Sequence, residues 1–133
     1  MLSYLYENFR VQMEICERRH YPMARQNIFD MKLSRIYPLL TAKAIKRGRT
    51  KEEADRIIFW LTGWNMSSVN MEMTYGDFLS NAPAFNPRAD LITGSVCGVK
   101  VEEIEDPLTK RMRQLDKLID ELSKGKPMDK ILR

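Results

Sequence analysis

Histidine is almost absent from this chain: among 133 residues there is one, His20. Nucleophilic catalysis by serine or cysteine usually depends on a histidine base, and protein zinc sites use histidine or several cysteines. The sequence also lacks the glycine-rich fingerprints that bind dinucleotides or nucleotide phosphates. These absences argue against an enzyme, and they predict a protein with no metal site and no cofactor.

Cysteines and long apolar runs are scarce as well. The two cysteines, Cys16 and Cys97, are too few for the disulfide framework of a small secreted domain. No apolar run approaches the roughly 20 residues of a membrane-spanning helix, and the N-terminus lacks the apolar segment of a secretory signal. We therefore expect a cytoplasmic protein that does not use a membrane as a partner.

The composition is otherwise that of an ordinary globular protein. Hydrophobic residues make up 44% and charged residues 30% of the sequence, and 133 residues suffice for one domain with its own core. We expect residues 23–133 to form a single compact domain, and residues 1–22 to be an N-terminal extension to it.

The clearest helix signal lies at residues 50–64 (TKEEADRIIFWLTGW). Thr50 followed three residues later by Glu53 predicts a capping box at the helix start. Gly63 suits the left-handed residue that ends a helix. One apolar face recurs at helical spacing and consists of Ala54, Ile57, Ile58 and Leu61.

Both tryptophans of the chain, Trp60 and Trp64, belong to this stretch. We therefore expect the helix and its tryptophans at the centre of the core. A Schellman motif is predicted at its end, and this motif would fold Trp64 back towards Phe59.

A second helix is expected just before the first, because Tyr37-Pro38 resembles a helix start and Gly48 a helix end. The connection between the two helices is too short for anything but close packing. The sequence therefore predicts a helical hairpin.

A long C-terminal helix is predicted from Asp106-Pro107, a cap followed by proline, to a stop near Gly125. Its apolar stripe consists of Leu108, Met112, Leu115, Ile119 and Leu122. We expect this stripe to face the core, although the same spacing could form the interface of a homodimer.

Shorter elements fill the remaining chain. Helical faces are predicted at residues 66–73 and 74–82. The start of a further helix, with a capping residue followed by proline, is predicted at residues 86–87, and a turn is predicted at residues 94–98. Residues 99–105 alternate like a strand but also keep helical spacing, and we favour a helix. The predicted fold class is all-α: a helical hairpin plus a long C-terminal helix and several short helices.

Several motifs follow one another in a distinctive order: NIFDMK at 27–32, YPL at 37–39, KRGRTKEE at 46–53, WLTGW at 60–64, NAP at 81–83, ITGSVCGVKVEEIEDP at 92–107, LDKLIDELSKGK at 115–126 and KILR at 130–133. Together they resemble a bacterial family that is known as domain-of-unknown-function family 2200. The resemblance implies no activity, substrate or cofactor, and it assigns no functional residue.

The turn at residues 94–98 (GSVCG) has two interpretations. Glycines around small residues before a helix start can aim backbone N–H groups at an anion. The simpler interpretation, which we favour, is a tight turn in which backbones pack closely. Cys97 is also a candidate nucleophile, but a structural cysteine is the favoured interpretation. The candidate anion-binding residues are Gly94, Ser95, Cys97 and Gly98.

An acidic run follows this turn, at Glu102, Glu103, Glu105 and Asp106. On one helical face, such carboxylates could hold Mg²⁺ or Ca²⁺ or act as a general acid and base. We favour the structural interpretation, because acids near a helix start complement the helix dipole and Asp106 can cap.

Cations surround the turn of the predicted hairpin: Lys43, Lys46, Arg47, Arg49 and Lys51. Helix-turn-helix proteins that bind DNA share this outline, but here the second helix begins with carboxylates, which argues against insertion into a groove. Contact with a nucleic-acid backbone through the turn stays open. Residues 23–51 carry eight basic side chains and one acid, whereas residues 52–106 carry ten acids and three basic side chains. We therefore favour pairing between these segments.

These observations lead to an expected function. The leading hypothesis is a small non-catalytic helical protein that acts through a protein partner or through self-association as a homodimer. The alternative is a nucleic-acid-associated protein that uses the basic turn at residues 43–51. An anion-binding or enzymatic site around residues 94–106 is the least favoured hypothesis.

The segment 1–22 raises a separate question. Its apolar stripe predicts an amphipathic helix, which could dock on the domain. We nevertheless expect that Met23 is the native initiator. Residues 17–19 (ERR) can be encoded by a purine-rich ribosome-binding sequence, and residues 20–22 would supply a workable distance from it to Met23.

Overall fold

The computed structural model describes residues 28–133. Its helices are α2 (Leu33–Lys46), α3 (Lys51–Thr62), α4 (Tyr75–Ser80), α5 (Pro107–Ser123) and α6 (Met128–Ile131), with short 3₁₀ helices η2 (Ile28–Asp30), η3 (Pro87–Leu91) and η4 (Val101–Glu103). Two short strands, β1 (Ser95–Val96) and β2 (Val99–Lys100), pair antiparallel. The predicted all-α class is confirmed. The expectations for residues 1–22 and for a start at Met23 lie outside the described residues.

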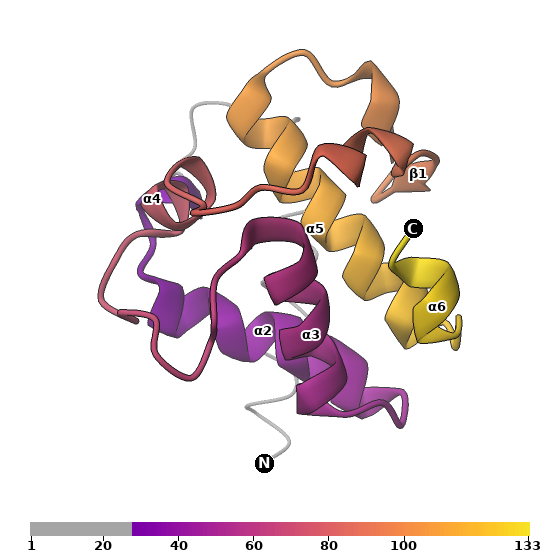
Figure 1. Ribbon diagram of the computed structural model, residues 1–133, viewed down its shortest axis with the longest axis horizontal. Coiled ribbons are helices and arrows are strands. Elements are labelled where there is room, and N and C mark those ends of the chain that lie inside the picture. Colours follow the sequence, from indigo (N-terminus) through magenta and orange to yellow (C-terminus); the bar gives the residue numbers. More distant parts are fainter. Residues whose placement is uncertain (1–27) are drawn as a thin grey trace.

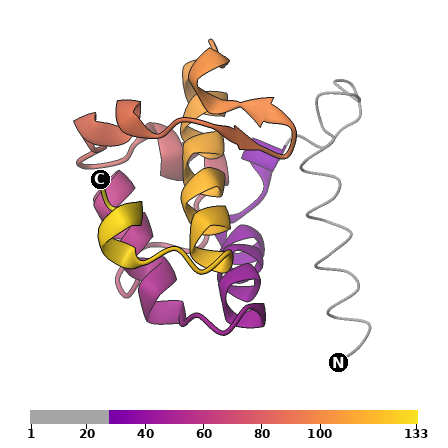
Figure 2. The same ribbon diagram turned by 90° about the vertical axis from the view of Figure 1, so that its right-hand side faces the viewer.

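Helix α5 occupies the middle of the domain, and the other elements surround it (Figures 1 and 2). It packs against α2, α3, α4 and α6, and also against β1 and η4. The predicted stripe of α5 faces this core, and the sequence prediction missed one member of it, Leu118, which is fully buried. The central element is therefore α5 rather than the α3 region, which the sequence had suggested.

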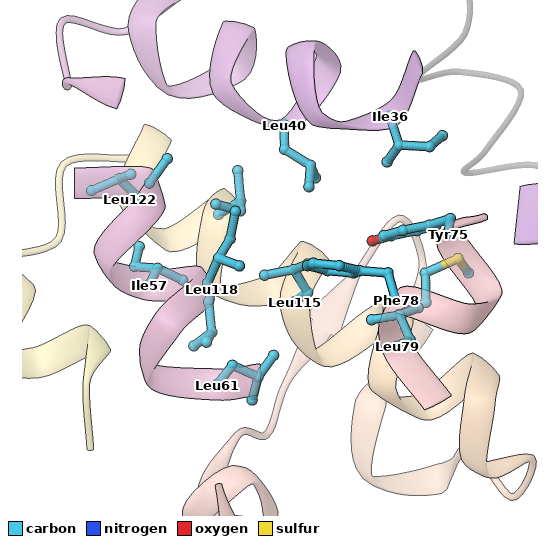
Figure 3. Packing of buried hydrophobic residues seen from close by; sticks show 14 of the residues in the cluster. Ile36, Leu40, Ile57, Leu61, Tyr75, Phe78, Leu79, Leu115, Leu118 and Leu122 are labelled. Carbon is cyan, nitrogen blue, oxygen red and sulfur yellow. The ribbon is translucent and has the colours of Figure 1, made fainter. Parts of the chain in front are cut away.

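The core is a layer of aliphatic side chains from α2, α3 and α5 that meets an aromatic pair from α4 (Figure 3). Tyr75 and Phe78 of this pair stack with their ring centroids 6.1 Å apart. The residues in the middle of the layer include Ile36, Leu40, Ile57, Leu61, Leu115, Leu118 and Leu122. Burial of this apolar surface is the main force that stabilises the fold.

The predicted start of α2 at Tyr37-Pro38 is wrong. The helix begins at Leu33, and Pro38 lies inside it. The backbone N–H of Leu33 donates to the carbonyl oxygen of Met73 at 2.8 Å, and that of Ser34 donates to Met71 at 3.0 Å. Because a distant loop satisfies the first N–H groups, tertiary contacts start the helix ahead of the local proline signal.

The capping box at the start of α3 is confirmed. The N–H of Glu53 donates to the Thr50 hydroxyl at 3.1 Å, and the N–H of Thr50 donates to the Glu53 carboxylate at 2.9 Å. The glycine that ends the preceding hairpin helix, Gly48, has the expected positive φ of 86°. The predicted helical hairpin of α2 and α3 is therefore present.

The end of α3 differs in detail from the prediction. Gly63 is left-handed with φ of 84°, and its N–H donates to the Phe59 carbonyl at 2.8 Å. The N–H of Trp64 donates instead to the Thr62 hydroxyl at 3.1 Å, so the stop is a single-bond left-handed cap rather than a Schellman motif. Trp64 stacks on Phe78 and does not fold back onto Phe59.

The tryptophans do not lie at the centre of the core. Trp60 and Trp64 are half-buried and pack against the edge of the buried cluster. The apolar stripe of α3, in contrast, is fully buried as predicted. The stripe thus places α3 in the core, and its aromatic residues reach the surface.

The helix expected at residues 66–73 is absent, and this stretch consists of turns. Asparagine side chains explain the difference, because Asn65 accepts the N–H of Ser67 and Asn70 accepts that of Glu72. Such local bonds compete with helix formation. The next predicted helix is confirmed as α4, and the Thr74 hydroxyl caps it. The capped start at residues 86–87 is also confirmed, and it begins η3.

The helix favoured at residues 99–105 is wrong, because these residues form β2 and η4. Cys97 and Gly98 have φ values of 53° and 79°. Two consecutive residues with positive φ match a type I′ turn, which joins antiparallel strands. The predicted turn at residues 94–98 thus consists of Gly94, strand β1 and the two-residue tip of a β-hairpin, Cys97 and Gly98.

The C-terminal part agrees with the sequence prediction. Asp106 caps α5 by accepting the N–H of Thr109 at 2.9 Å, and Pro107 is its first residue. The chain turns at Gly125, and α6 supplies the final helical turn. None of the helices in residues 28–133 has the length and apolar character needed to cross a membrane.

Candidate functional site

The five cations of the predicted basic turn surround the connection between α2 and α3, but they differ in their surroundings. Lys43 pairs with Asp120 at 3.2 Å, and Lys51 pairs with Asp55 at 3.1 Å. Lys46 and Arg47 are exposed. Arg49 pairs with Glu53, and only 18% of its side chain is exposed. The structure therefore brings these residues together, and it uses Lys43, Arg49 and Lys51 in ion pairs within the domain.

Arg49 connects the α2–α3 turn to the chain at the end of α5. Its guanidinium binds both carboxylate oxygens of Glu53, at 3.2 and 2.9 Å. The same group donates to the carbonyl oxygens of Leu122 at 3.3 Å and Lys126 at 3.0 Å, where α5 ends. The hydrogen bonds from Arg49, followed by the N–H of Thr50, lower the pKa of Glu53 to about 2.

These bonds place a second basic turn beside the first. In Figure 2 the α2–α3 turn and the α5–α6 turn lie at the same end of the molecule. The second turn contains Lys124, Gly125 and Lys126, and thus repeats the cation–glycine–cation pattern of residues 47–49. We name the combined surface the basic edge; it consists of Lys43, Lys46, Arg47, Arg49, Lys124 and Lys126.

The carboxylates of the basic edge lie beneath its cations. Asp120 binds both Lys43 and Lys124, at 3.2 and 3.1 Å, although only 14% of its side chain is exposed. Burial acts to raise the pKa of Asp120, but the two lysines together lower it. Glu121, which is 9% exposed, pairs with Lys126 at 3.5 Å and with Arg133 at 2.8 Å. Each carboxylate is thus shared by two cations.

The predicted anion-binding residues lie in the β-hairpin, and no helix begins there. The N–H of Gly94 already donates to the Glu102 carboxylate at 3.0 Å, a bond that leads the causes lowering the pKa of Glu102. Lys117 donates to the carbonyl oxygen of Ser95 at 3.1 Å. The loop therefore holds one of the protein's own carboxylates, and the tight-turn interpretation accounts for its glycines. Cys97 carries no free thiol in the structure.

The acidic run does not form one helical face. Glu102 bonds the Gly94 N–H, whereas Asp106 caps α5. Within residues 28–133, no three His, Cys, Asp or Glu side chains come close enough to hold a metal ion.

A second surface, which the sequence prediction missed, surrounds the C-terminal end of α3. Phe59 is 57% exposed, and Trp60 and Trp64 are half-buried. The half-buried Phe85 belongs to a segment that runs along the same end, because the N–H of Asn86 donates to the Leu61 carbonyl at 2.8 Å. We name this surface the aromatic end; it consists of Phe59, Trp60, Trp64 and Phe85. The motif WLTGW was the available signal, but helical spacing alone had placed its tryptophans in the core.

Two side chains of the aromatic end, Trp64 and Phe85, are held in place by polar contacts. The indole N–H of Trp64 donates to the Phe78 carbonyl at 2.7 Å. Arg111 lies over the Phe85 ring at 4.2 Å and donates to the Leu79 carbonyl at 2.7 Å. The half-buried rings of Trp64 and Phe85 are therefore presented in a fixed arrangement.

A polar group also lies inside the core, between α2, α4 and α5. The Tyr75 side chain points towards Leu40 and Leu115 (Figure 3), and within residues 28–133 its hydroxyl has no hydrogen-bond partner. Burial raises the pKa of Tyr75, and also that of Asp116, which pairs with the buried Arg113 at 3.4 Å. No periodicity in the sequence distinguishes this polar group from the apolar positions around it.

Comparison with known proteins agrees with the described fold. No curated protein matches the chain significantly. Among solved structures, the chain is similar to the crystal structure of the uncharacterized protein SP1917, with 38% sequence identity and a TM-score of 0.75. This similarity covers 83% of the present chain and 93% of the other.

The family comparison covers the whole described domain. The model of the family described as "Uncharacterized protein conserved in bacteria (DUF2200)" matches residues 27–133. This range agrees with the resemblance seen in the sequence motifs. The chain therefore belongs to the DUF2200 family of bacterial proteins.

Proposed function

We propose that this protein acts without catalysis, by binding another protein at the aromatic end. The observation that supports the proposal is the group of four aromatic side chains at one end of α3, one of them more than half exposed. Aromatic residues and arginine are the types enriched in the buried centres of protein interfaces. Arg111, which stacks on Phe85, adds an arginine to these aromatic residues.

The arrangement also suits binding because the surroundings of Phe59 are fixed in advance. Trp64 and Arg111 are each tied to a backbone carbonyl, and Asn86 ties the Phe85 segment to α3. A surface that is already ordered loses less side-chain entropy when a partner docks. The partner is expected to offer an apolar surface that covers Phe59.

A photo-cross-linking experiment tests the proposal. Phe59 is replaced in the full chain by benzoylphenylalanine, the protein is irradiated in an extract of its native host, and cross-linked products are identified by mass spectrometry. The matched control carries the same group at Leu91, which is 55% exposed on η3 and is not one of the four residues of the aromatic end. We expect one protein to be captured at position 59 and not at position 91.

The captured protein is then purified, and its affinity is measured for the unmodified chain and for Phe59→Ala. We expect the variant to bind at least about tenfold more weakly, as for a truncated aromatic hot spot that contributes more than about 1.4 kcal/mol. If the captured protein is a second copy of this chain, light scattering must show a dimer that Phe59→Ala dissociates. Equal capture at positions 59 and 91, or unchanged affinity of the variant, would contradict the proposal.

A further inference from the structure

We propose that the basic edge binds the phosphate backbone of a nucleic-acid duplex without reading its sequence. This function goes beyond the proposed protein binding, because it uses a different surface and a partner of different chemistry. It rests on the two turns that the fold brings together, which are far apart in the sequence and are joined by the bonds of Arg49.

The first argument is the layering of charge. Lys46 and Arg47 are exposed on one turn, and Lys124 and Lys126 are 73% and 40% exposed on the other. The two carboxylates that these cations share, Asp120 and Glu121, are in contrast only 14% and 9% exposed, and Glu53, which Arg49 binds, is 30% exposed. An approaching polyanion therefore meets cations first, and the shared carboxylates beneath neutralise only part of their charge.

The second argument concerns which polyanion fits. A protein interface needs apolar or aromatic anchors, but among residues 28–133 the one large apolar side chain exposed beside the basic edge is Ile45. Single-stranded nucleic acids are held by stacking on aromatic rings, and the six residues of the basic edge include no aromatic side chain. Binding to the backbone of a duplex requires only cations and hydrogen-bond donors, and the residues of the basic edge supply both.

The third argument excludes base recognition through α3. This helix begins with the exposed Glu52, and Glu53 is bound to Arg49. Carboxylates at this position repel the phosphates that flank a groove. The duplex is therefore expected to contact the turns and not to receive the helix.

The experiment measures fluorescence anisotropy of a labelled random-sequence DNA duplex with the full chain, between roughly 50 and 200 mM salt. Two double variants test the two turns separately: Lys46→Ala with Arg47→Ala, and Lys124→Ala with Lys126→Ala. The control is Lys32→Ala with Lys100→Ala, which removes two exposed lysines outside the basic edge. Circular dichroism verifies that all variants keep the fold.

We expect the affinity of the native chain to fall steeply with salt. Each test variant should weaken binding and should flatten the slope of log K against log salt by about 2, one for each cation that no longer neutralises a phosphate. The control should keep the native slope. Shuffled sequences should bind as tightly as the original duplex, because the backbone is the same in all of them.

Several results would overturn this assignment. One is the absence of binding at low salt, and another is a loss of affinity in the control as large as in the test variants. If the variant of the first turn weakens binding and the variant of the second turn does not, the second turn is not part of the binding surface. Polyglutamate that competes as well as the duplex would show a surface for acidic proteins instead. None of these results bears on Phe59 and the aromatic end, so the two proposals fail independently.

Discussion

At the scale of single residues, Arg49 shows why one basic residue is not equivalent to another. Its planar group has donors enough for two carboxylate oxygens and two backbone carbonyls at once. The sequence predicted a cation at this turn, but it could not predict the carbonyl oxygens at the end of α5, because nothing local connects positions so far apart. These bonds give Arg49 a structural role in the fold, in addition to its place in the basic edge.

Arg49→Lys should therefore destabilise the protein although the charge is kept. A lysine ammonium cannot reproduce the forked geometry, and at least one half-buried acceptor loses its donor. We expect a cost of about 1–3 kcal/mol in the free energy of unfolding, measured by urea denaturation.

Arg47→Lys is the matched control, because Arg47 lies two residues away and is exposed. It should change the free energy of unfolding by no more than about 0.5 kcal/mol. Equal effects of the two substitutions would show that the bonds of Arg49 contribute nothing.

At the scale of elements, the helix ends that local side chains determine could be predicted from the sequence, and those that depend on distant contacts could not. The ends of α3 and α5 followed from the capping side chains of Thr50 and Asp106 and from the glycines after the helices, because these interactions span few residues. The start of α2 depends on the carbonyls of Met71 and Met73, which local patterns do not reveal. The β-hairpin was missed because its turn uses Cys97, a residue type that rarely adopts positive φ.

Two helix-ending glycines allow backbone conformation to be separated from crowding. Gly48 and Gly63 have nearly equal φ values, 86° and 84°. A Cβ at Gly48 would meet nothing within 4 Å, whereas a Cβ at Gly63 would lie 2.8 Å from the backbone nitrogen of Ala84. We therefore expect Gly48→Ala to cost about 1–2 kcal/mol, the strain of a left-handed residue, and Gly63→Ala to cost clearly more.

Thermal or urea denaturation of both variants provides the measurement. The difference between them reports the contact of α3 with the segment at Ala84, since the conformational strain is common to both. Equal costs would mean that this segment moves away freely, and the aromatic end would then not be fixed in advance.

At the scale of the whole molecule, the candidate surfaces were only half predictable. The first turn of the basic edge is continuous in sequence, and its cations were identified from it. Its second turn depends on where α5 ends. The neighbours of Trp60 and Trp64 at the aromatic end depend on the hydrogen bonds that join residues 84–86 to the end of α3. Hydrophobic spacing identifies buried positions, but it does not show which side chains at the border of the core stay exposed.

The central position of α5 predicts where the fold is most sensitive. Leu118 is fully buried and lies on the helix that contacts nearly every other element. Leu118→Ala should cost about 2–5 kcal/mol in the free energy of unfolding, because it removes apolar contacts and leaves a cavity.

Ile45→Ala serves as the comparison, because Ile45 is 53% exposed at the end of α2. We expect its effect on the free energy of unfolding to stay within about 0.5 kcal/mol. If chemical denaturation gave Leu118→Ala an equally small effect, α5 would not be the centre of the core.

The order of the elements along the chain has a consequence for synthesis on the ribosome. Helices α2, α3 and α4 are made before α5, yet each buries its apolar face against it. Because translation proceeds from the N-terminus, the first half of the domain emerges without the surface that covers it. During that interval the nascent chain exposes the stripe of α3 and the rings of α4. It is then most open to aggregation and to capture by chaperones, and this exposure ends only when α5 has left the ribosome.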